Sequence, residues 1–355
     1  MARVVLVTGV STGAGRRFAS ALAADPGVDR VIGVDVRPPD PDPDDAASGV
    51  TFVRADIRSP AIGKTLQRHE VDTVVHLGVQ PPPPGGRGRA VVKEANVIGS
   101  MQLLAACQRL RGIRRLVLRS TTAVYGSSPD DPSMFSEDME PRRMPTSAYA
   151  RDAIEVERYV RGFARRRPDV AVCALRFSSV IGPSVRTALT EYLTLPVVPT
   201  MLGFDPRLQF VHTDDLVNAL ITATLAGPES VAGEGSCAVV NVSGDGVLTL
   251  VQALRRLGRP VLPVPGFAFR PLRHAYRAAR WGQVDSEQAA FLTYGRGVDT
   301  TRMREELKFE PAYDSQAAFE TFVASVQLGP LDAERVRAAE QELADALGVR
   351  VPHGR

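Results

Sequence analysis

Short, mostly apolar, strand-like runs alternate with helix-like stretches along the first half of the chain. The apolar runs cover residues 4–7, 31–34, 50–53, 73–77, 116–118 and 171–177. Polar and apolar positions alternate at helical spacing between them, over residues 16–24, 60–69, 90–110 and 149–165. Continuous apolar runs are typical of strands buried on both faces, and their alternation with helices predicts a parallel sheet covered by helices. We therefore expect an α/β fold with a Rossmann-type, doubly wound parallel sheet.

The pattern becomes less regular and richer in proline beyond residue 182. We expect a smaller, mixed α/β C-terminal domain there. The first domain is assigned to residues 1–182 and about 208–243, and the second to residues 183–207 and about 244–330. Residues 331–355 are expected to form a C-terminal amphipathic helix and a tail.

Composition excludes several classes of protein. Hydrophobic residues make up 44% and charged residues 23% of the 355 residues, as in soluble globular proteins. The 43 basic residues are balanced by 40 acidic ones, so a nucleic-acid partner is not expected. The five histidines show no ligand spacing, and no metal site is expected. No apolar stretch is long enough to cross a membrane.

Cysteine usage bears on the compartment. The three cysteines, Cys107, Cys173 and Cys237, are scattered and odd in number, which favours reduced thiols over a disulfide framework. No signal peptide is visible, because the first apolar run is short and leads directly into a glycine turn. We therefore expect a cytoplasmic protein.

The first apolar run is followed by a glycine-rich turn, a helix-like segment and a second apolar run. Glycines let a chain turn sharply and approach a pyrophosphate, and the helix N-terminus offers free N–H groups to it. This order of parts predicts a dinucleotide site, although an ordinary glycine turn in an α/β protein is the alternative. The candidate positions in the turn are Gly9, Thr12, Gly13, Ala14 and Gly15.

The second apolar run ends in an acid, Asp35, about twenty residues beyond the last glycine. A carboxylate there binds a free ribose 2′-hydroxyl and repels a 2′-phosphate. Arg37 could favour the phosphate or stack on adenine. The sequence favours NAD over NADP as cofactor.

Six further motifs follow in order. They are Arg54-Ala55-Asp56-Ile57, Val74-Val75-His76-Leu77-Gly78, Asn96-Val97-Ile98-Gly99, Ser120-Thr121-Thr122-Ala123-Val124-Tyr125-Gly126, Leu175-Arg176-Phe177 to Ile181-Gly182-Pro183, and Phe210-Val211-His212-Thr213-Asp214-Asp215. With these motifs the chain resembles the extended short-chain dehydrogenase/reductases of the NAD-dependent epimerase/dehydratase family, which includes UDP-galactose 4-epimerase. The resemblance runs over most of residues 3–310. It implies an NAD-binding first domain, a substrate-binding second domain, a small-molecule substrate such as a nucleotide sugar, and a homodimer.

The resemblance also implies roles for individual residues. Tyr149 and Thr121 match the family's catalytic tyrosine and hydroxyl residue. The tyrosine exchanges a proton with the substrate oxygen while nicotinamide exchanges a hydride with the carbon. The cofactor-binding residues that the resemblance adds are Asp56, Ile57, Leu77, Gly78, Asn96 and Tyr149 itself.

Three features of the sequence depart from the family pattern. The glycines are spaced Gly-x-x-x-Gly-x-Gly rather than Gly-x-x-Gly-x-x-Gly. Leu208 stands where the epimerases carry an arginine for the nucleotide phosphates, with Arg207 one residue away. Ala153 replaces the lysine of the Tyr-x-x-x-Lys motif, and no other tyrosine has a lysine four residues later.

The missing lysine has a calculable cost. An unaided tyrosine titrates near 10, so a lysine that lowers its pKa by two to three units contributes roughly 3 to 4 kcal/mol to the base step. Its loss slows that step by about 10²- to 10³-fold. An arginine from Arg119, Arg151 or Arg176 could restore charge but could not relay protons, and Arg151 points away from Tyr149 on a helix.

Three functions stay open from the sequence. The first is an NAD-dependent nucleotide-sugar epimerase or dehydratase with weak or atypical activity. The second is a non-catalytic NAD-binding regulator or scaffold. The third is a reductase or dehydrogenase of a non-sugar metabolite.

Two segments outside these motifs also invite interpretation. Residues 80–89 combine four prolines with a Gly-Gly-Arg-Gly-Arg run, which is equally consistent with a flap and with a loop of no function. Residues 270–281 place basic side chains at helical spacing, which indicates a solvated basic face more than a diphosphate site.

Overall fold

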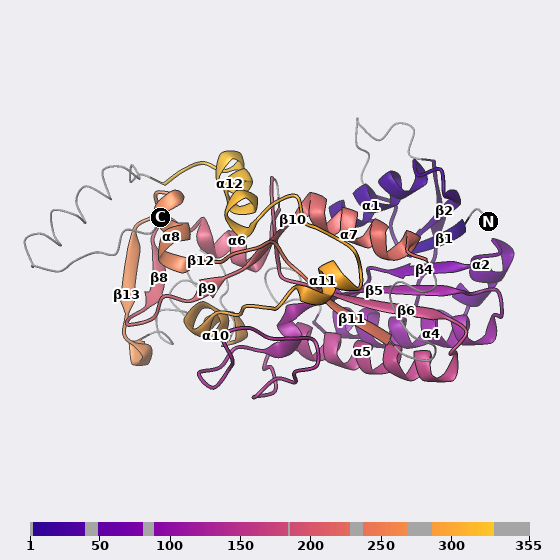
Figure 1. The fold of residues 1–355 in the computed structure, drawn as a ribbon, viewed down its shortest axis with the longest axis horizontal. Coiled ribbons are helices and arrows are strands. Elements are labelled where there is room, and N and C mark those ends of the chain that lie inside the picture. The colour runs from indigo at the N-terminus through magenta and orange to yellow at the C-terminus, as the bar shows by residue number, and fades with distance from the viewer. Residues whose placement is uncertain are drawn as a thin grey trace, which may run out of the picture.

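A seven-stranded parallel sheet forms the centre of the first part of the molecule in the computed structural model (Figure 1). The structure describes residues 3–39, 49–80, 89–183, 185–227, 237–268 and 286–329. The strand order is β11-β6-β5-β4-β1-β2-β3, with every neighbouring pair parallel. The strands are β1 (Arg3–Thr8), β2 (Val28–Asp35), β3 (Val50–Arg54), β4 (Thr73–His76), β5 (Arg115–Thr121), β6 (Ala171–Phe177) and β11 (Cys237–Val242).

Helices cover both faces of this sheet, as Figure 1 shows. One face carries α1 (Gly13–Ala23) and α7 (Thr213–Leu225), which pack against each other. The other carries α2 (Ile62–Arg68), α4 (Ser100–Arg109) and α5 (Ala148–Arg166). Each face has its own apolar cluster, because the strands bury side chains on both sides. The Rossmann-type, doubly wound fold predicted from the sequence is confirmed.

The long helix predicted over residues 90–110 is interrupted in the structure. It consists of α3 (Arg89–Lys93), the π-helical turn η2 (Glu94–Gly99) and α4. The buried Asn96 lies inside η2, and its side chain binds the segment after β4 instead of solvent. π-turns of this kind are often found at functional sites, and hydrophobic spacing alone does not reveal them.

A second, smaller part of the chain has its own apolar cluster, built from residues 181–210, 248–257 and 292–322. It contains three two-stranded pairs: β7 (Ser179–Ile181) with β10 (Phe210–His212), β9 (Arg207–Leu208) with β12 (Leu248–Thr249), and β8 (Val198–Met201) with β13 (Val261–Val264). Its helices are α6 (Ala188–Leu193), α8 (Leu250–Arg256), α10 (Ser286–Tyr294) and α12 (Ser315–Ser325). The domain boundaries given above stay a prediction, and this cluster draws on both assigned domains through Ile181 and Phe210.

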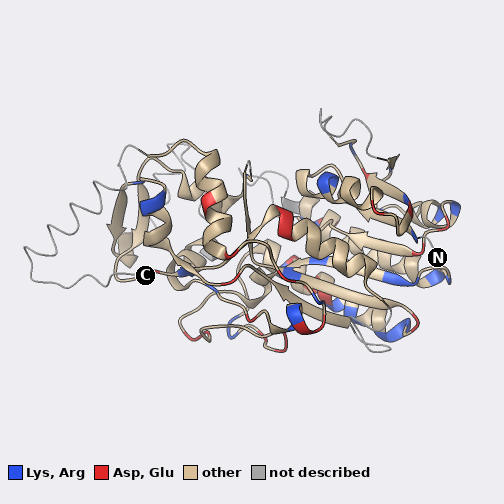
Figure 2. Ribbon diagram, turned by 45° about the horizontal axis from the view of Figure 1, so that its top comes forward, with Lys and Arg blue, Asp and Glu red and all other residues tan. Residues whose placement is uncertain are grey.

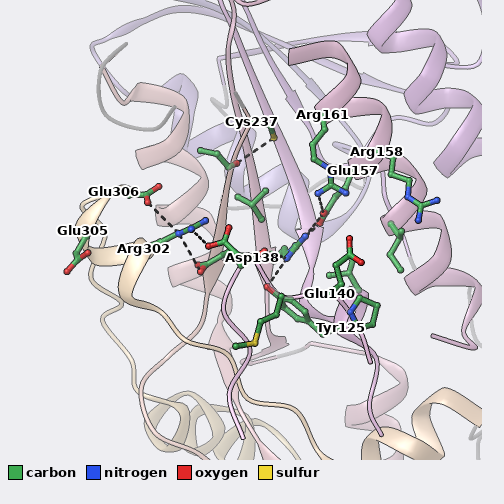
Figure 3. Close-up of a pocket in the computed structure, with 18 of the residues that line it drawn as sticks. Tyr125, Asp138, Glu140, Glu157, Arg158, Arg161, Cys237, Arg302, Glu305 and Glu306 are labelled. Carbon is green, nitrogen blue, oxygen red and sulfur yellow. Dashed lines mark hydrogen bonds and ion pairs between the residues drawn. The ribbon is translucent and has the colours of Figure 1, made fainter. Parts of the chain in front are cut away.

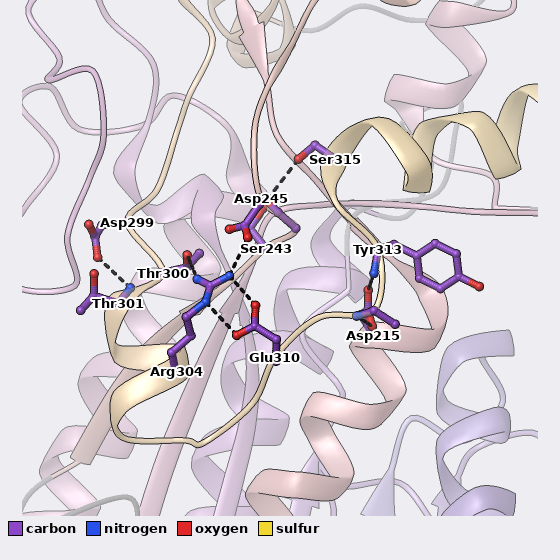
Figure 4. A network of polar contacts seen from close by, with 12 residues as sticks. Asp215, Ser243, Asp245, Asp299, Thr300, Thr301, Arg304, Glu310, Tyr313 and Ser315 are labelled. Carbon is purple, nitrogen blue, oxygen red and sulfur yellow. Dashed lines mark hydrogen bonds and ion pairs between the residues drawn. The ribbon is translucent and has the colours of Figure 1, made fainter.

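Polar contacts join the final segments to the first part of the molecule (Figure 4). Buried Asp215, from the Phe-Val-His-Thr-Asp-Asp motif, accepts hydrogen bonds from the N–H groups of Ala312 and Tyr313. Arg304, in α11 (Thr301–Glu305), forms ion pairs with Asp245 and Glu310. These contacts hold the chain between α11 and α12 against the C-terminal edge of the sheet region.

Basic and acidic residues are scattered over both parts of the molecule (Figure 2). Across the described ranges, no helix combines the length and the apolar character needed to span a bilayer. The basic stretch 270–281, the loop residues 81–88 and the C-terminal helix predicted over 331–347 lie outside the described residues.

Candidate cofactor and active site

The strand order reverses between β1 and β4, which places the site at their C-terminal ends. From β1 the chain continues to β2 on one side, and β4 and β5 lie on the other. Ligands of open α/β sheets bind in the crevice at such a switch point. The loops after β1, β2, β4 and β5 all reach this edge.

The glycine turn after β1 is held by one side chain and by close backbone contacts. Thr12 caps α1, since its oxygen accepts the Gly15 N–H at 3.1 Å, and its hydroxyl donates to the Gly9 carbonyl at 2.9 Å. Gly9 has a φ of +80°, and a Cβ on Gly15 would lie 2.2 Å from the Gly9 oxygen. A Cβ on Gly13 would meet nothing within 4 Å. The turn therefore needs glycine at Gly9 and Gly15 for its own shape, and leaves open space at Gly13 at the start of α1.

The carboxylate of Asp35 is fixed at the tip of β2. Its Oδ2 accepts hydrogen bonds from the hydroxyl and the N–H of Ser11, and its Oδ1 accepts one from the N–H of Val36. Asp35 thus ties β2 to the glycine turn. Arg37 is exposed two residues further on.

The loop after β3 brings Asp56 and Ile57 to the same edge, since the Ala55 N–H bonds the Asp35 carbonyl. Both carboxylate oxygens of Asp56 accept from the Arg58 guanidinium. Hydrogen bonding to Arg58 lowers the pKa of Asp56, which keeps it ionised. Ile57 packs closely against Gly99 at the end of η2.

The end of β4 touches the glycine turn directly. A Cβ on Gly9 would lie 3.3 Å from the Leu77 carbonyl, so these two residues are in contact. Gly78 leaves no room for a side chain beside His76. The His76 ring is fully buried between the hydroxyls of Thr8 and Ser100, each at 2.7 Å, and burial lowers its pKa to about 4.

Asn96 connects β4 to α5. Its Oδ1 accepts the Gln80 N–H at 3.1 Å, and its Nδ2 donates to the Gln80 carbonyl at 3.0 Å. The same Nδ2 donates to Oδ2 of Asp152 on α5 at 3.1 Å. Asn96 therefore ties the segment after β4 to α5, while its predicted role in binding the cofactor stays a prediction.

The residues present fit a dinucleotide. The turn offers the N-terminus of α1 and an open face at Gly13 to a pyrophosphate, and Asp35 is anchored where a ribose diol would lie. Leu77, Gly78 and Asp56 border the same crevice. The predicted cofactor residues of these loops therefore lie along one edge of the sheet. Arg37 is exposed at this edge.

Tyr149 and Thr121 lie on elements that pack against each other. Tyr149 stands in the first turn of α5, which Ser147 caps by accepting the Ala150 N–H. Thr121 ends β5 and caps the short helix η3 (Thr122–Tyr125), since its oxygen accepts the Ala123 N–H at 3.2 Å. Both side chains are partly exposed, and α5 contacts both β5 and η3.

No lysine takes the place of the missing one. Ala153 is 1% exposed and packs into the apolar cluster between the sheet and α5. The three lysines of the chain lie elsewhere, on α2, on α3 and after α11. Arg151 donates to the carbonyls of Thr146 and Ser147, as expected for a side chain pointing away from Tyr149.

The suggestion that Arg176 could restore the lost charge is wrong. Arg176 is buried in a bidentate ion pair with Glu157, and its remaining nitrogen donates to the Tyr125 hydroxyl and the Glu137 carbonyl. The Ser120 hydroxyl also donates to Glu157. A buried guanidinium held by a carboxylate is neutralised and cannot swing toward Tyr149.

Both residues of this ion pair line a cavity of about 960 Å³ that β11 also borders, and Glu157 is labelled in Figure 3. The cavity is bordered by α5, β11, α11 and residues 137–144, and Arg302 faces it in contact with Asp138 and Glu306. It lies away from β1 and β2, so it is distinct from the cofactor crevice.

On the substrate side, Leu208 is fully buried in the third apolar cluster, so it contributes only packing. Arg207 is exposed. Arg296 was not predicted from the sequence. Its Nε donates to the Gly126 carbonyl and its terminal nitrogen donates to the Ser127 hydroxyl, so Arg296 contacts the loop that follows η3. Ser11 and Asp152 were also missed. A hydroxyl between the glycines was the available signal for Ser11, and an acid beside the absent lysine was the signal for Asp152.

Known proteins are similar to this chain in sequence. An uncharacterised protein of Mycobacterium tuberculosis is 44% identical over 99% of this chain and 92% of its own length. The human short-chain dehydrogenase/reductase family 42E member 1 is 31% identical over 62% of this chain and 58% of its own length.

Solved structures show the same fold at lower identity. UDP-glucuronic acid 4-epimerase from Bacillus cereus, in complex with UDP-glucuronic acid and NAD, has a TM-score of 0.68 and 20% identity over 94% of this chain and 99% of its own. MoeE5 in complex with UDP-glucuronic acid and NAD has a TM-score of 0.68 and 23% identity over 90% of this chain and 98% of its own. The sequence model of the NAD dependent epimerase/dehydratase family matches residues 5–242. The chain belongs to the NAD-dependent epimerase/dehydratase family, as its motifs predict.

Proposed function

We propose that the protein is an NAD-dependent oxidoreductase of the nucleotide-sugar epimerase or dehydratase type. Tyr149 is its acid/base and Thr121 orients the reacting oxygen. The site works without a lysine, so the chemistry is slow or specialised.

The position of Tyr149 carries this proposal. In the crossover from β5 to β6, α5 begins at the edge where β4 and β5 end, and Tyr149 stands in its first turn. The Thr121 oxygen accepts the Ala123 N–H, which leaves its own O–H able to donate to a substrate oxygen. Tyr149 can then take the proton from a substrate hydroxyl or return it. NAD, when bound, supplies the hydride acceptor.

One finding from the comparisons supports a substrate with phosphate groups. The structural neighbours bind UDP-glucuronic acid and UDP-glucose. Because Leu208 is buried, any contact with such phosphate groups must come from a residue other than that position.

The test is incubation of the wild type with a panel of UDP- and TDP-sugars in the presence of NAD. We expect slow turnover of at least one of them, and a loss of at least 10²-fold in Tyr149→Phe. Tyr159→Phe is the matched control, because Tyr159 lies on the same helix but bonds Glu155 outside the site. Absence of turnover by the wild type, or unchanged turnover in Tyr149→Phe, would contradict the proposal.

A non-catalytic NAD-binding regulator is the second candidate, and the burial of Ala153 favours it. An apolar residue packed into the core leaves no charge to lower the pKa of a tyrosine. Under this alternative the wild type binds NAD without turnover. A gain of turnover in Ala153→Lys would then show that the substrate geometry survives and that only the charge was lost.

We also propose a homodimer formed through the outer side of α4 and α5. Ile98 and Met101 are exposed apolar residues at the start of this surface. Sedimentation equilibrium of the wild type and of Met101→Glu would test this, with a monomeric wild type contradicting it.

A further inference from the structure

One buried carboxylate near the active site has no role in the function proposed above. Asp152 is 4% exposed on α5, three residues after Tyr149 and one before Ala153. Its Oδ2 accepts a hydrogen bond from Asn96. Carboxylates are rarely buried unless hydrogen-bonded, and this one stands next to the position from which the chain has lost a cation.

A chain of contacts connects Asp152 to the end of β4 and to the glycine turn. Asn96 joins it to the backbone of Gln80, whose side chain donates to the Leu77 carbonyl at 2.8 Å. Leu77 in turn touches Gly9 in the glycine turn. Residues three apart on a helix share a face, so Asp152 also neighbours Tyr149, which acts where nicotinamide meets substrate.

We propose that Asp152 biases the site toward the oxidised form of the cofactor. The nicotinamide ring carries one positive charge in NAD⁺ and none in NADH, and the two forms otherwise match. A nearby buried carboxylate therefore attracts NAD⁺ more strongly than NADH. A lysine at position 153 would act in the opposite direction, and the chain has replaced it by a neutral side chain.

The bias has a consequence for the direction of hydride movement. When a substrate hydroxyl is oxidised, its proton leaves to a base, its C–H hydride moves to the ring, and the positive charge of the ring disappears. A carboxylate that stabilises the charged ring opposes that step and favours the return of the hydride to the substrate carbon. Such a bias suits a reaction in which the cofactor ends in the state in which it began.

This inference rests on the cofactor site and not on turnover, so it can be tested by binding alone. The dissociation constants of NAD⁺ and NADH are measured by titration calorimetry on nucleotide-free full-length protein. Asp152→Asn keeps an oxygen that can accept from Asn96 and removes only the charge. Removing that charge makes the potential at the ring more positive whatever other groups surround it.

We expect the ratio of the NADH to the NAD⁺ dissociation constant to fall by roughly tenfold in Asp152→Asn. Asp152→Ser, a second neutral variant, should shift the ratio in the same direction if the first variant folds poorly. Glu155→Gln removes a charge from the same helix at a position bonded to Tyr159, and should leave the ratio unchanged.

An unchanged ratio in both neutral variants, with both forms still bound, would overturn the inference and leave the proposed function standing. A wild type that binds neither form would overturn the inference together with the cofactor site. Slow or absent sugar turnover would bear on the proposed function alone.

Discussion

The Ser11 hydroxyl donates a hydrogen bond of 2.6 Å to the Asp35 carboxylate, which joins the glycine turn to the tip of β2. The Ser11 N–H donates to the same oxygen at 3.1 Å. One acid therefore shapes the glycine turn, and we expect the same acid to bind the adenosine ribose. Its two roles can be separated by mutation.

Asp35→Ala should weaken NAD binding by about 10- to 100-fold, since hydrogen bonds to a charged group contribute roughly 1.5–3 kcal/mol. It should also reduce the preference for NAD over NADP, because the repulsion of a 2′-phosphate is lost. Ser11→Ala is the control: it loosens the turn but keeps the carboxylate, so NAD affinity falls while the NAD to NADP ratio holds. Equal ratios in the wild type and Asp35→Ala would contradict this role of Asp35.

Two glycines of the same turn should respond differently to alanine. In Gly13→Ala the new Cβ meets open space at the start of α1, so the free energy of unfolding should stay the same or rise slightly. The Cβ would occupy the approach of the phosphates, so NAD affinity should fall at least tenfold. In Gly15→Ala the Cβ would clash with the Gly9 carbonyl, and both stability and affinity should fall.

Chemical denaturation and calorimetry of the two variants provide the measurement. Undiminished NAD binding in Gly13→Ala would show that the phosphates do not pass this position.

The buried pair of Arg176 and Glu157 should be the most costly ion pair to break among those in the described residues. Glu157→Leu leaves a buried guanidinium uncompensated, which costs about 3–5 kcal/mol of unfolding free energy. The double variant Glu157→Leu with Arg176→Met should recover most of that loss. Asp130→Ala, which breaks the exposed pair with Arg143, should cost less than about 1 kcal/mol.

Urea denaturation of the wild type and of these three variants tests the prediction. A loss in Glu157→Leu no larger than that in Asp130→Ala would mean that the pair does not hold α5 to β6.

Stability should depend on pH through His76. Burial lowers its pKa to about 4 in the folded protein, against about 6.5 when unfolded. Between these values the unfolded chain binds a proton that the folded protein does not, so the stability is lost as pH falls from about 6.5 to about 4. The loss amounts to about 3 kcal/mol for this residue.

Thermal or urea unfolding of the wild type and His76→Asn from pH 7.5 to pH 4.5 gives the measurement. The difference in unfolding free energy between the two proteins should shrink as pH falls. A constant difference would show that His76 has the same pKa in the folded and the unfolded protein.

The sequence predicted the structure correctly wherever a local pattern of residues is compatible with only one kind of structure. The apolar runs form the parallel strands of the sheet, because a strand covered by helices on both faces must bury apolar side chains on both sides. Gly9 and Gly15 predicted the turn, because the backbone geometry at these two positions requires glycine. The family followed from such motifs taken in order. Periodicity could not show the π-turn at Asn96, since the polar contacts that hold it come from Gln80 and Asp152, distant in sequence.

By itself, the sequence determined the sheet, the glycine turn, the acid at the tip of β2 and the absence of the catalytic lysine, because each depends on residue types at short spacing. Tertiary structure decided how the charges are used. Only the fold shows that Arg176 is neutralised by Glu157, and that Asp152 is buried and bonded to Asn96. The strength of a charge depends on its burial and on its partners, and in this chain those partners are brought together from separate strands and helices.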